Sequence, residues 1–241
     1  MKILVLGAGS LLHAQRAMSS FVLDDFVLLD APPSVTLSLR QAGVPPLSIR
    51  TVCISHFHGD HIGGLPFLLA EYDSVLHRRD PLRIVGPPGV RARTEEFYEM
   101  MFPGALGWNS TYERSFVELE ENGSFEADGV KVRAREVAHG DAALGFRLEL
   151  DGQSVGYTGD TAWCDAILDL AEGADCLIAD CAHPAGRGHP SHLGFGDIEE
   201  LRARLPESTL IVLTHLAEDP DELPPGVVVP GDGELLTLPA R

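Results

Sequence analysis

Short apolar runs alternate along this chain with longer stretches in which apolar positions recur every three or four residues. The short runs are rich in β-branched side chains, as strands are, and the longer stretches have the periodicity of amphipathic helices. Their alternation predicts a layered α/β fold. The predicted strands cover residues 2–6, 26–29, 51–55, 83–85, 130–136, 145–150, 154–157, 176–179 and 209–213, and the predicted helices cover residues 34–42, 62–71, 89–101, 161–171 and 197–204.

Two local motifs refine the boundaries of these elements. Asp151-Gly152 separates two predicted strands. Because this dipeptide favours the tight turn of a hairpin, the strands at 145–150 and 154–157 are expected to be antiparallel neighbours. Asp197 is followed three residues later by Glu200. This acidic variant of the capping box predicts that a helix begins at Asp197.

The composition fits a single domain that spans residues 1–241. Hydrophobic residues make up 44% of the 241 residues, enough for a large core. The longest apolar stretches, such as 3–6 and 210–213, are far shorter than the ~20 residues that a membrane-spanning helix needs. Since the run at 3–6 is also too short for a secretory leader, we expect a cytoplasmic protein without a membrane partner. The four cysteines form no Cys-x-x-Cys pair, so neither disulfides nor a cysteine-bound zinc is expected.

The net charge limits the kinds of partner that the chain can bind. Its formal net charge is -18, and no long segment rich in Lys and Arg offsets it. Such a surface repels the phosphate backbone of nucleic acid. A small anionic substrate remains compatible with this charge, because bound divalent cations would dominate the local potential of a site.

The strongest chemical signal is the segment His56-Phe57-His58-Gly59-Asp60-His61, which follows an apolar predicted strand. Imidazole and carboxylate are ligands that suit zinc and neighbouring transition metals. In an extended loop, residues two apart point the same way, so His56 and His58 can converge on one ion. Asp60 and His61 can then serve a second ion. Surface histidines at a strand end are the plain alternative, but four ligand-type side chains within six positions are rare by chance.

Three further ligand-type residues follow predicted strands elsewhere in the chain. His139 follows residues 132–137, Asp160 follows 154–157, and His215 follows 210–213. The ends of strands are where the sheets of α/β proteins gather their ligand sites. We therefore expect these three residues to complete a site that one loop cannot complete alone.

Taken together, these residues resemble the metallo-β-lactamase superfamily, and within it the ribonuclease Z-like phosphodiesterase branch. The motif His-x-His-x-Asp-His of this superfamily is intact at residues 56–61. The resemblance implies an αββα four-layer sandwich, in which two sheets lie back to back with helices outside. It also implies two metal ions: His56, His58 and His139 would bind the first, Asp60, His61 and His215 would bind the second, and Asp160 would bridge both.

His192 narrows the resemblance to the ribonuclease Z-like branch. Ser191-His192-Leu193 precedes the predicted helix at 197–204, in the place where this branch has a histidine that serves as acid/base or phosphate contact. An exposed loop histidine is the alternative, and we favour that alternative for His183 and His189 in the same loop. Only 21 positions separate His139 from Asp160, too few for the arm with which ribonuclease Z grips transfer RNA. No transfer RNA partner is therefore expected, and the short spacing resembles smaller phosphodiesterases, including those that act on cyclic phosphates.

The resulting hypothesis is a hydrolase that uses two divalent ions, with zinc expected and manganese or iron as alternatives. In this hypothesis Asp60 orients the attacking water, and His192 protonates the leaving alkoxide or binds the phosphate. Asp180 is a candidate to orient His192, and Asp30 to support the metal loop. Gly7-Ala8-Gly9 is expected to be only a tight turn, because a third glycine is absent at Leu12.

Three other functions remain open on the same scaffold. A lactonase, a thioesterase or another carbonyl-ester hydrolase would use the same seven ligands but would not need His192. An iron-dependent redox enzyme or a metal-binding protein without catalysis would share only the ligand set. The sequence also leaves open whether the chain forms a homodimer.

Overall fold

The computed structural model describes residues 1–140, 142–183 and 185–239. The strands in these residues form two sheets. In spatial order the first sheet contains β14 (Leu235–Thr237), β1 (Lys2–Gly7), β2 (Ser20–Leu23), β3 (Val27–Leu29), β4 (Thr51–Cys53), β5 (Leu82–Gly86) and β6 (Arg114–Glu118). The second contains β13 (Val227–Val228), β12 (Leu210–Thr214), β11 (Cys176–Asp180), β10 (Gln153–Tyr157), β9 (Leu144–Leu150), β8 (Val130–Glu136) and β7 (Ser124–Ala127). Strands β3 to β6 and strands β10 to β13 run parallel within their sheets.

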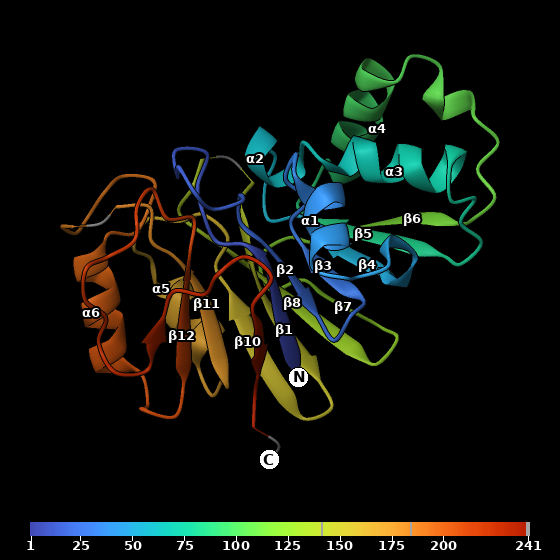
Figure 1. Cartoon of the computed structure of the whole chain (residues 1–241). Helices are drawn as coiled ribbons and strands as arrows, with labels where there is room; N and C mark the ends of the chain where they lie inside the picture. Colours follow the sequence, from blue (N-terminus) through green and yellow to red (C-terminus); the bar gives the residue numbers. More distant parts are fainter. Residues whose placement is uncertain (141, 184, 240–241) are drawn as a thin grey trace.

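Helices cover the outer face of each sheet (Figure 1). The first sheet is covered by α1 (Val35–Gln41), α3 (Leu65–Ser74) and α4 (Val90–Met101), and the second by α5 (Asp165–Ala171) and α6 (Phe195–Arg204). One further helical turn, α2 (Gly59–Ile62), lies at the end of the sandwich where several loops gather (Figure 1). The 3-10 turns are η1 (Pro46–Ser48) and η2 (Ala105–Gly107). None of the described helices has the length and apolar character that crossing a membrane requires.

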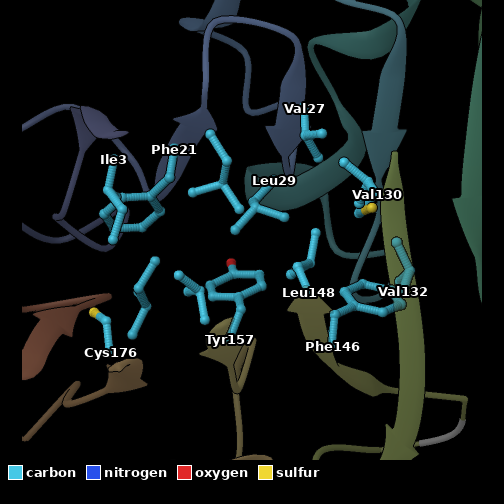
Figure 2. Packing of buried hydrophobic residues seen from close by; sticks show 14 of the residues in the cluster. Ile3, Phe21, Val27, Leu29, Val130, Val132, Phe146, Leu148, Tyr157 and Cys176 are labelled. Carbon is cyan, nitrogen blue, oxygen red and sulfur yellow. The ribbon is translucent and has the colours of Figure 1, made fainter. Parts of the chain in front are cut away.

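The hydrophobic core has three layers, as the predicted αββα arrangement requires. The middle layer lies between the two sheets and joins residues such as Phe21 and Leu29 of the first sheet to Phe146 and Tyr157 of the second (Figure 2). The two outer layers lie between each sheet and its helices. Strands with one face on the middle layer and the other under helices are buried on both sides, which is why they appear in the sequence as continuous apolar runs.

The structure confirms most predicted elements and corrects several boundaries. The hairpin at Asp151-Gly152 is present, since β9 and β10 pair antiparallel and both turn residues have the positive φ that such turns need. The expected helix start at Asp197 is wrong, because α6 begins at Phe195. Asp197 instead occupies the third helical position, where its carboxylate accepts the backbone N–H of Gly194 at 2.9 Å.

The other differences concern a divided helix, a later helix start and five omitted strands. The single helix predicted over 62–71 is divided at Gly63-Gly64, where the chain passes the backbone of Pro32 so closely that a Cβ on Gly64 would lie 1.9 Å from its carbonyl oxygen. The helix predicted over 161–171 begins later, at Asp165. The prediction omitted β2, β6, β7, β13 and β14. Of these, β6 and β7 are edge strands with half-exposed, partly polar residues, and β13 and β14 are only two and three residues long.

Candidate metal centre

The candidate ligands follow strands that end at the same edge of the sandwich. His56 follows β4, while His139, Asp160 and His215 follow β8, β10 and β12. Because β8 and β10 both pair antiparallel with β9, they run in the same direction, and β12 runs parallel to them through β11. The carboxyl ends of these strands therefore bring residues far apart in sequence to one place, as parallel sheets commonly do at their ligand sites.

The structure brings together all of the predicted ligand residues. His56, His58, His139 and Asp160 form one group, and Asp60, His61 and His215 form a second, each with potential ligand atoms within 4.8 Å of one another. A third group with the same spacing joins Asp160 and His215 to His192. These groups coincide with the two half-sites that the sequence resemblance implied.

Asp160 lies between the two half-sites. Its Oδ2 is 3.2 Å from His61 Nε2 and 3.3 Å from His215 Nε2 in the second group. The same oxygen is 3.8 Å from Nε2 of both His56 and His139 in the first group. One carboxylate oxygen that faces ligand nitrogens of both groups has the position that a bridging ligand requires.

Hydrogen bonds fix the rings of three histidines so that Nε2 faces the centre. His56 Nδ1 lies 3.0 Å from Ser55 Oγ, whose own proton is donated to Asp30 Oδ2 at 2.8 Å, so the imidazole donates to the serine. His61 Nδ1 donates to Asp30 Oδ2 at 2.8 Å, and His139 Nδ1 donates to the carbonyl of Ser191 at 2.7 Å. Metal-ligating histidines commonly make this kind of outer hydrogen bond, which sets the tautomer and the orientation of the ring.

The inward-facing nitrogens fit a bound cation. Within the described part of the chain, the buried His56 Nε2 makes no hydrogen bond, and the buried His61 Nε2 has only the 3.2 Å approach of Asp160 Oδ2. A buried polar atom without a partner is costly and calls for an explanation. Divalent ions at the two groups would satisfy both nitrogens, and the set of five imidazoles and two carboxylates has the chemistry that zinc, manganese and iron prefer.

The electrostatics of the centre also favour cation binding. Burial, reinforced by the neighbouring His61, lowers the pKa of His56 to about 2, and burial lowers the pKa of His58 and His139 as well. These rings are therefore neutral at physiological pH, which is the form that ligates metals. His61 is the exception: burial opposes its charged form, but Asp160 and Asp30 outweigh burial and raise its pKa well above the ordinary value. A cation bound at His61 Nε2 would take the place of the proton that the charged form carries there.

Asp30, which follows β3, connects the two sheets behind the centre. Its side chain is completely buried and accepts hydrogen bonds from the Ser55 backbone, the Ser55 hydroxyl, His61 and the Tyr157 hydroxyl. The prediction that Asp30 supports the metal loop is consistent with these contacts. The roles of Ser55, Tyr157 and the Ser191 carbonyl could not be predicted, because serine, tyrosine and backbone carbonyl groups carry no distinctive sequence pattern.

His192 lies beside both half-sites and is held by Asp180. Its Nδ1 donates to Asp180 Oδ2 at 2.9 Å, and its ring stacks on His215 with centroids 4.9 Å apart. Asp180 ends β11, is completely buried, and also accepts the backbone N–H groups of Thr161 and Ala182. Burial lowers the pKa of His192, although Asp160 opposes this shift. The hydrogen bond to Asp180 leaves His192 Nε2 as the nitrogen that can meet a substrate.

His183 and His189 lie near this site, but among the described residues neither belongs to one of the three groups of potential metal ligands. Their rings are 3.9 Å apart at the centroids, and each is about 6 Å from the His192 ring, at 6.2 Å and 6.1 Å. His189 Nδ1 accepts the backbone N–H of Ser191 at 3.3 Å. The prediction that these two residues take no part in the chemistry stays a prediction.

The fold and the ligand clusters define a metal-dependent hydrolase with an αββα sandwich. Residues 26–216 match the family model described as a beta-lactamase superfamily domain. The chain therefore belongs to the beta-lactamase superfamily. This membership confirms the resemblance that the His-x-His-x-Asp-His motif indicated.

Similar proteins agree with this assignment. Ribonuclease Z of Methanosarcina mazei is 27% identical over 275 aligned positions, which cover 90% of this chain and 88% of that protein. The short form of human tRNase Z has the same fold, with a TM-score of 0.75, 22% identity and 100% coverage of both chains. A diphosphatase of the PhnP family superposes with a TM-score of 0.74 and 21% identity, covering 98% of this chain and 97% of that one. Within its superfamily, the chain is thus similar to ribonuclease Z.

Proposed function

We propose that this protein is a dinuclear metal phosphodiesterase that acts on a small phosphate diester or a cyclic phosphate. The observation that carries the proposal is the Asp180–His192 pair, which lies beside both half-sites with a 2.9 Å hydrogen bond between its members. Cleavage of a phosphate ester needs a proton donor for the leaving alkoxide as well as a nucleophile. The relatives named ribonuclease Z and the diphosphatase among the structural neighbours also support chemistry at phosphate.

Each residue has a distinct role in the proposed mechanism. His56, His58 and His139 would hold one divalent ion, Asp60, His61 and His215 would hold the other, and Asp160 would bridge them. When bound, these ions would lower the pKa of a water molecule and neutralise phosphate oxygens. Asp60, half-buried at the edge of the cluster, accepts a hydrogen bond from the attacking water and orients it. In its doubly protonated form His192 donates the Nε2 proton to the leaving oxygen or to the phosphate and becomes neutral, while Asp180 accepts the Nδ1 proton in a hydrogen bond and holds the ring in place.

The size and charge of the molecule support a small substrate rather than a transfer RNA. In the described chain, strand β9 and the hairpin to β10 occupy much of the interval between His139 and Asp160, which leaves little length for an inserted arm. The net charge of -18 disfavours contact with a long polyanion. The same proposal includes zinc as the metal, a single domain over residues 1–241 and a cytoplasmic location.

A substrate screen tests this function. The purified protein, with its metal content measured, is assayed against bis(4-nitrophenyl) phosphate, a 2′,3′-cyclic nucleotide, 4-nitrophenyl phosphate, a lactone, a thioester and a precursor transfer RNA. The proposal expects turnover of the two diesters well above that of the monoester and the carbonyl esters. Turnover of the lactone or thioester alone would reject it in favour of a carbonyl-ester hydrolase, and selective cleavage of the precursor RNA would reject the small-substrate assignment.

A further inference from the structure

The backbone of His215 adopts a conformation that residues other than glycine rarely take. Its φ is +58°, in the left-handed region. This residue directly follows β12, so the left-handed turn sets the direction in which its imidazole leaves the strand. Such a conformation persists only when the surrounding structure holds it.

The ring of His215 lacks the outer hydrogen bond that fixes His56, His61 and His139. Among the described residues, no hydrogen-bond partner is present for its buried Nδ1. The nearest carboxylate oxygen, Asp180 Oδ1, is 3.8 Å away, beyond hydrogen-bond distance. The position of this ring must therefore come mainly from its backbone and its packing.

Ser19 supplies the contacts that hold this backbone. Its hydroxyl accepts the backbone N–H of His215 at 2.9 Å and the hydroxyl of Thr214 at 2.8 Å, and it donates to the carbonyl of Gly9 at 3.3 Å. A serine hydroxyl has one proton and two lone pairs, so these three bonds use its full capacity. The side chain is buried, at 1% exposure, so water cannot replace any of the three.

The loop that carries Ser19 also holds the residue after His215. Leu216 donates its N–H to the carbonyl of Ala8 at 3.1 Å and accepts the N–H of Ser10 at 2.8 Å. Gly7 allows the loop to return this closely, because a Cβ there would lie 2.4 Å from the carbonyl oxygen of Met18. The expectation that Gly7-Ala8-Gly9 is a tight turn is therefore wrong: Gly7 ends β1, and Gly9 forms isolated β-bridges with Met18 and Leu216.

We propose that Ser19 is a positioning residue for the second metal half-site, acting through the left-handed backbone of His215. The inference rests on the proposed function only in that it takes His215 as a metal ligand. Its consequences concern binding of the metal and do not depend on which ester the protein cleaves. Loss of the hydroxyl would leave two buried donors, the His215 N–H and the Thr214 hydroxyl, without an acceptor.

The test is a titration of the metal-free protein with Zn²⁺ in the presence of a competing chelator. We expect Ser19→Ala to weaken binding of one of the two zinc ions by about 10-fold or more, the range typical for loss of an outer partner of a ligand. The other ion, held by the group that contains His58, should bind as in the unchanged protein. In a His215→Ala background, Ser19→Ala should cause no further loss of affinity.

Thr209→Val is the matched control, since it removes a buried hydroxyl at the opposite end of β12, where Thr209 Oγ1 donates to the carbonyl of Ala174. This variant should bind both ions normally. If Ser19→Ala fails to fold, Thr214→Val gives a milder version of the same change, and a smaller loss at the same ion is expected. Unchanged zinc affinity in Ser19→Ala overturns the proposal. An equal loss of zinc affinity on introducing Ser19→Ala into the unchanged protein and into the His215→Ala variant overturns it as well. A protein that binds two zinc ions but cleaves no phosphodiester would reject the proposed function and leave this inference standing.

Discussion

The hydroxyl of Tyr157 in the second sheet donates a 2.6 Å hydrogen bond to Oδ2 of Asp30, which follows strand β3 of the first sheet, directly behind the candidate metal ligands. Figure 2 shows Tyr157 among the residues packed between the sheets, with its hydroxyl oxygen directed toward the first sheet. The same Asp30 oxygen accepts His61 Nδ1 at 2.8 Å. The contact between the sheets and the orientation of a ligand therefore depend on a single buried carboxylate.

Replacement of Asp30 should lower both the metal affinity of the site and the stability of the fold, and the two effects can be measured separately. Asp30→Asn places an amide N–H₂ group among donors, so we expect the free energy of unfolding to fall by about 2–4 kcal/mol. Because His61 loses its carboxylate partner, metal affinity should fall by about 10- to 100-fold. Denaturant unfolding of the metal-free protein and a zinc titration measure the two effects. Tyr157→Phe, the control, removes one donor and should cost only about 1 kcal/mol with little change in metal affinity. Equal metal affinity in Asp30→Asn and the unchanged protein would contradict this role.

Loss of His192 should stop the chemistry without removing the metals. Because a positioned acid typically contributes about 10²- to 10⁴-fold, His192→Ala should lower kcat on a phosphate diester by this amount. Elemental analysis should find the same metal content as in the unchanged protein. His189→Ala, which removes an exposed ring 6.1 Å away, serves as the control and should keep its activity. Full turnover of the diester by the His192 variant would remove the acid role and favour a carbonyl-ester hydrolase.

Metal content should respond differently to the loss of Asp160 and of His58. Asp160 Oδ2 faces nitrogens of both half-sites, at distances from 3.2 to 3.8 Å, so Asp160→Asn should lower the content to less than one ion per chain. His58 belongs to one group only, and His58→Ala should leave about one ion. Elemental analysis after dialysis measures both, and removal of all metal with EDTA should lower the Tm because bound metal stabilises the folded state. The same loss in both variants would argue against Asp160 as the shared ligand.

The sequence predicted those parts of the molecule whose side chains are both distinctive and placed at strand ends. His56, His139 and His215 could be selected because imidazoles after apolar runs are uncommon, and the apolar runs themselves predicted most of the central strands, although the short buried strand β2 was missed. Residues such as Ser19 and Ser55 could not be selected. Their importance arises from tertiary contacts, and a serine in a loop has no pattern that separates a buried positioning hydroxyl from an exposed one. The edge strand β6 was omitted for a similar reason, since its half-exposed residues mix polar and apolar side chains.

Asp180 should act on turnover through His192, because its carboxylate holds the ring and touches no candidate reacting atom. Asp180→Asn keeps the shape of the side chain but offers an amide N–H₂ group in place of one acceptor oxygen, so its donors, His192 Nδ1 among them, share one acceptor fewer. We expect kcat on a diester to fall by about 10- to 100-fold, with KM and metal content little changed. Asp175→Asn is the matched control, since Asp175 lies just before β11 at its other end and accepts the backbone N–H of Ser154. The double variant Asp180→Asn/His192→Ala should be no slower than His192→Ala alone. A further drop in the double variant, or loss of metal in Asp180→Asn, would show that Asp180 acts instead through His215, whose Nδ1 lies 3.8 Å from its other oxygen.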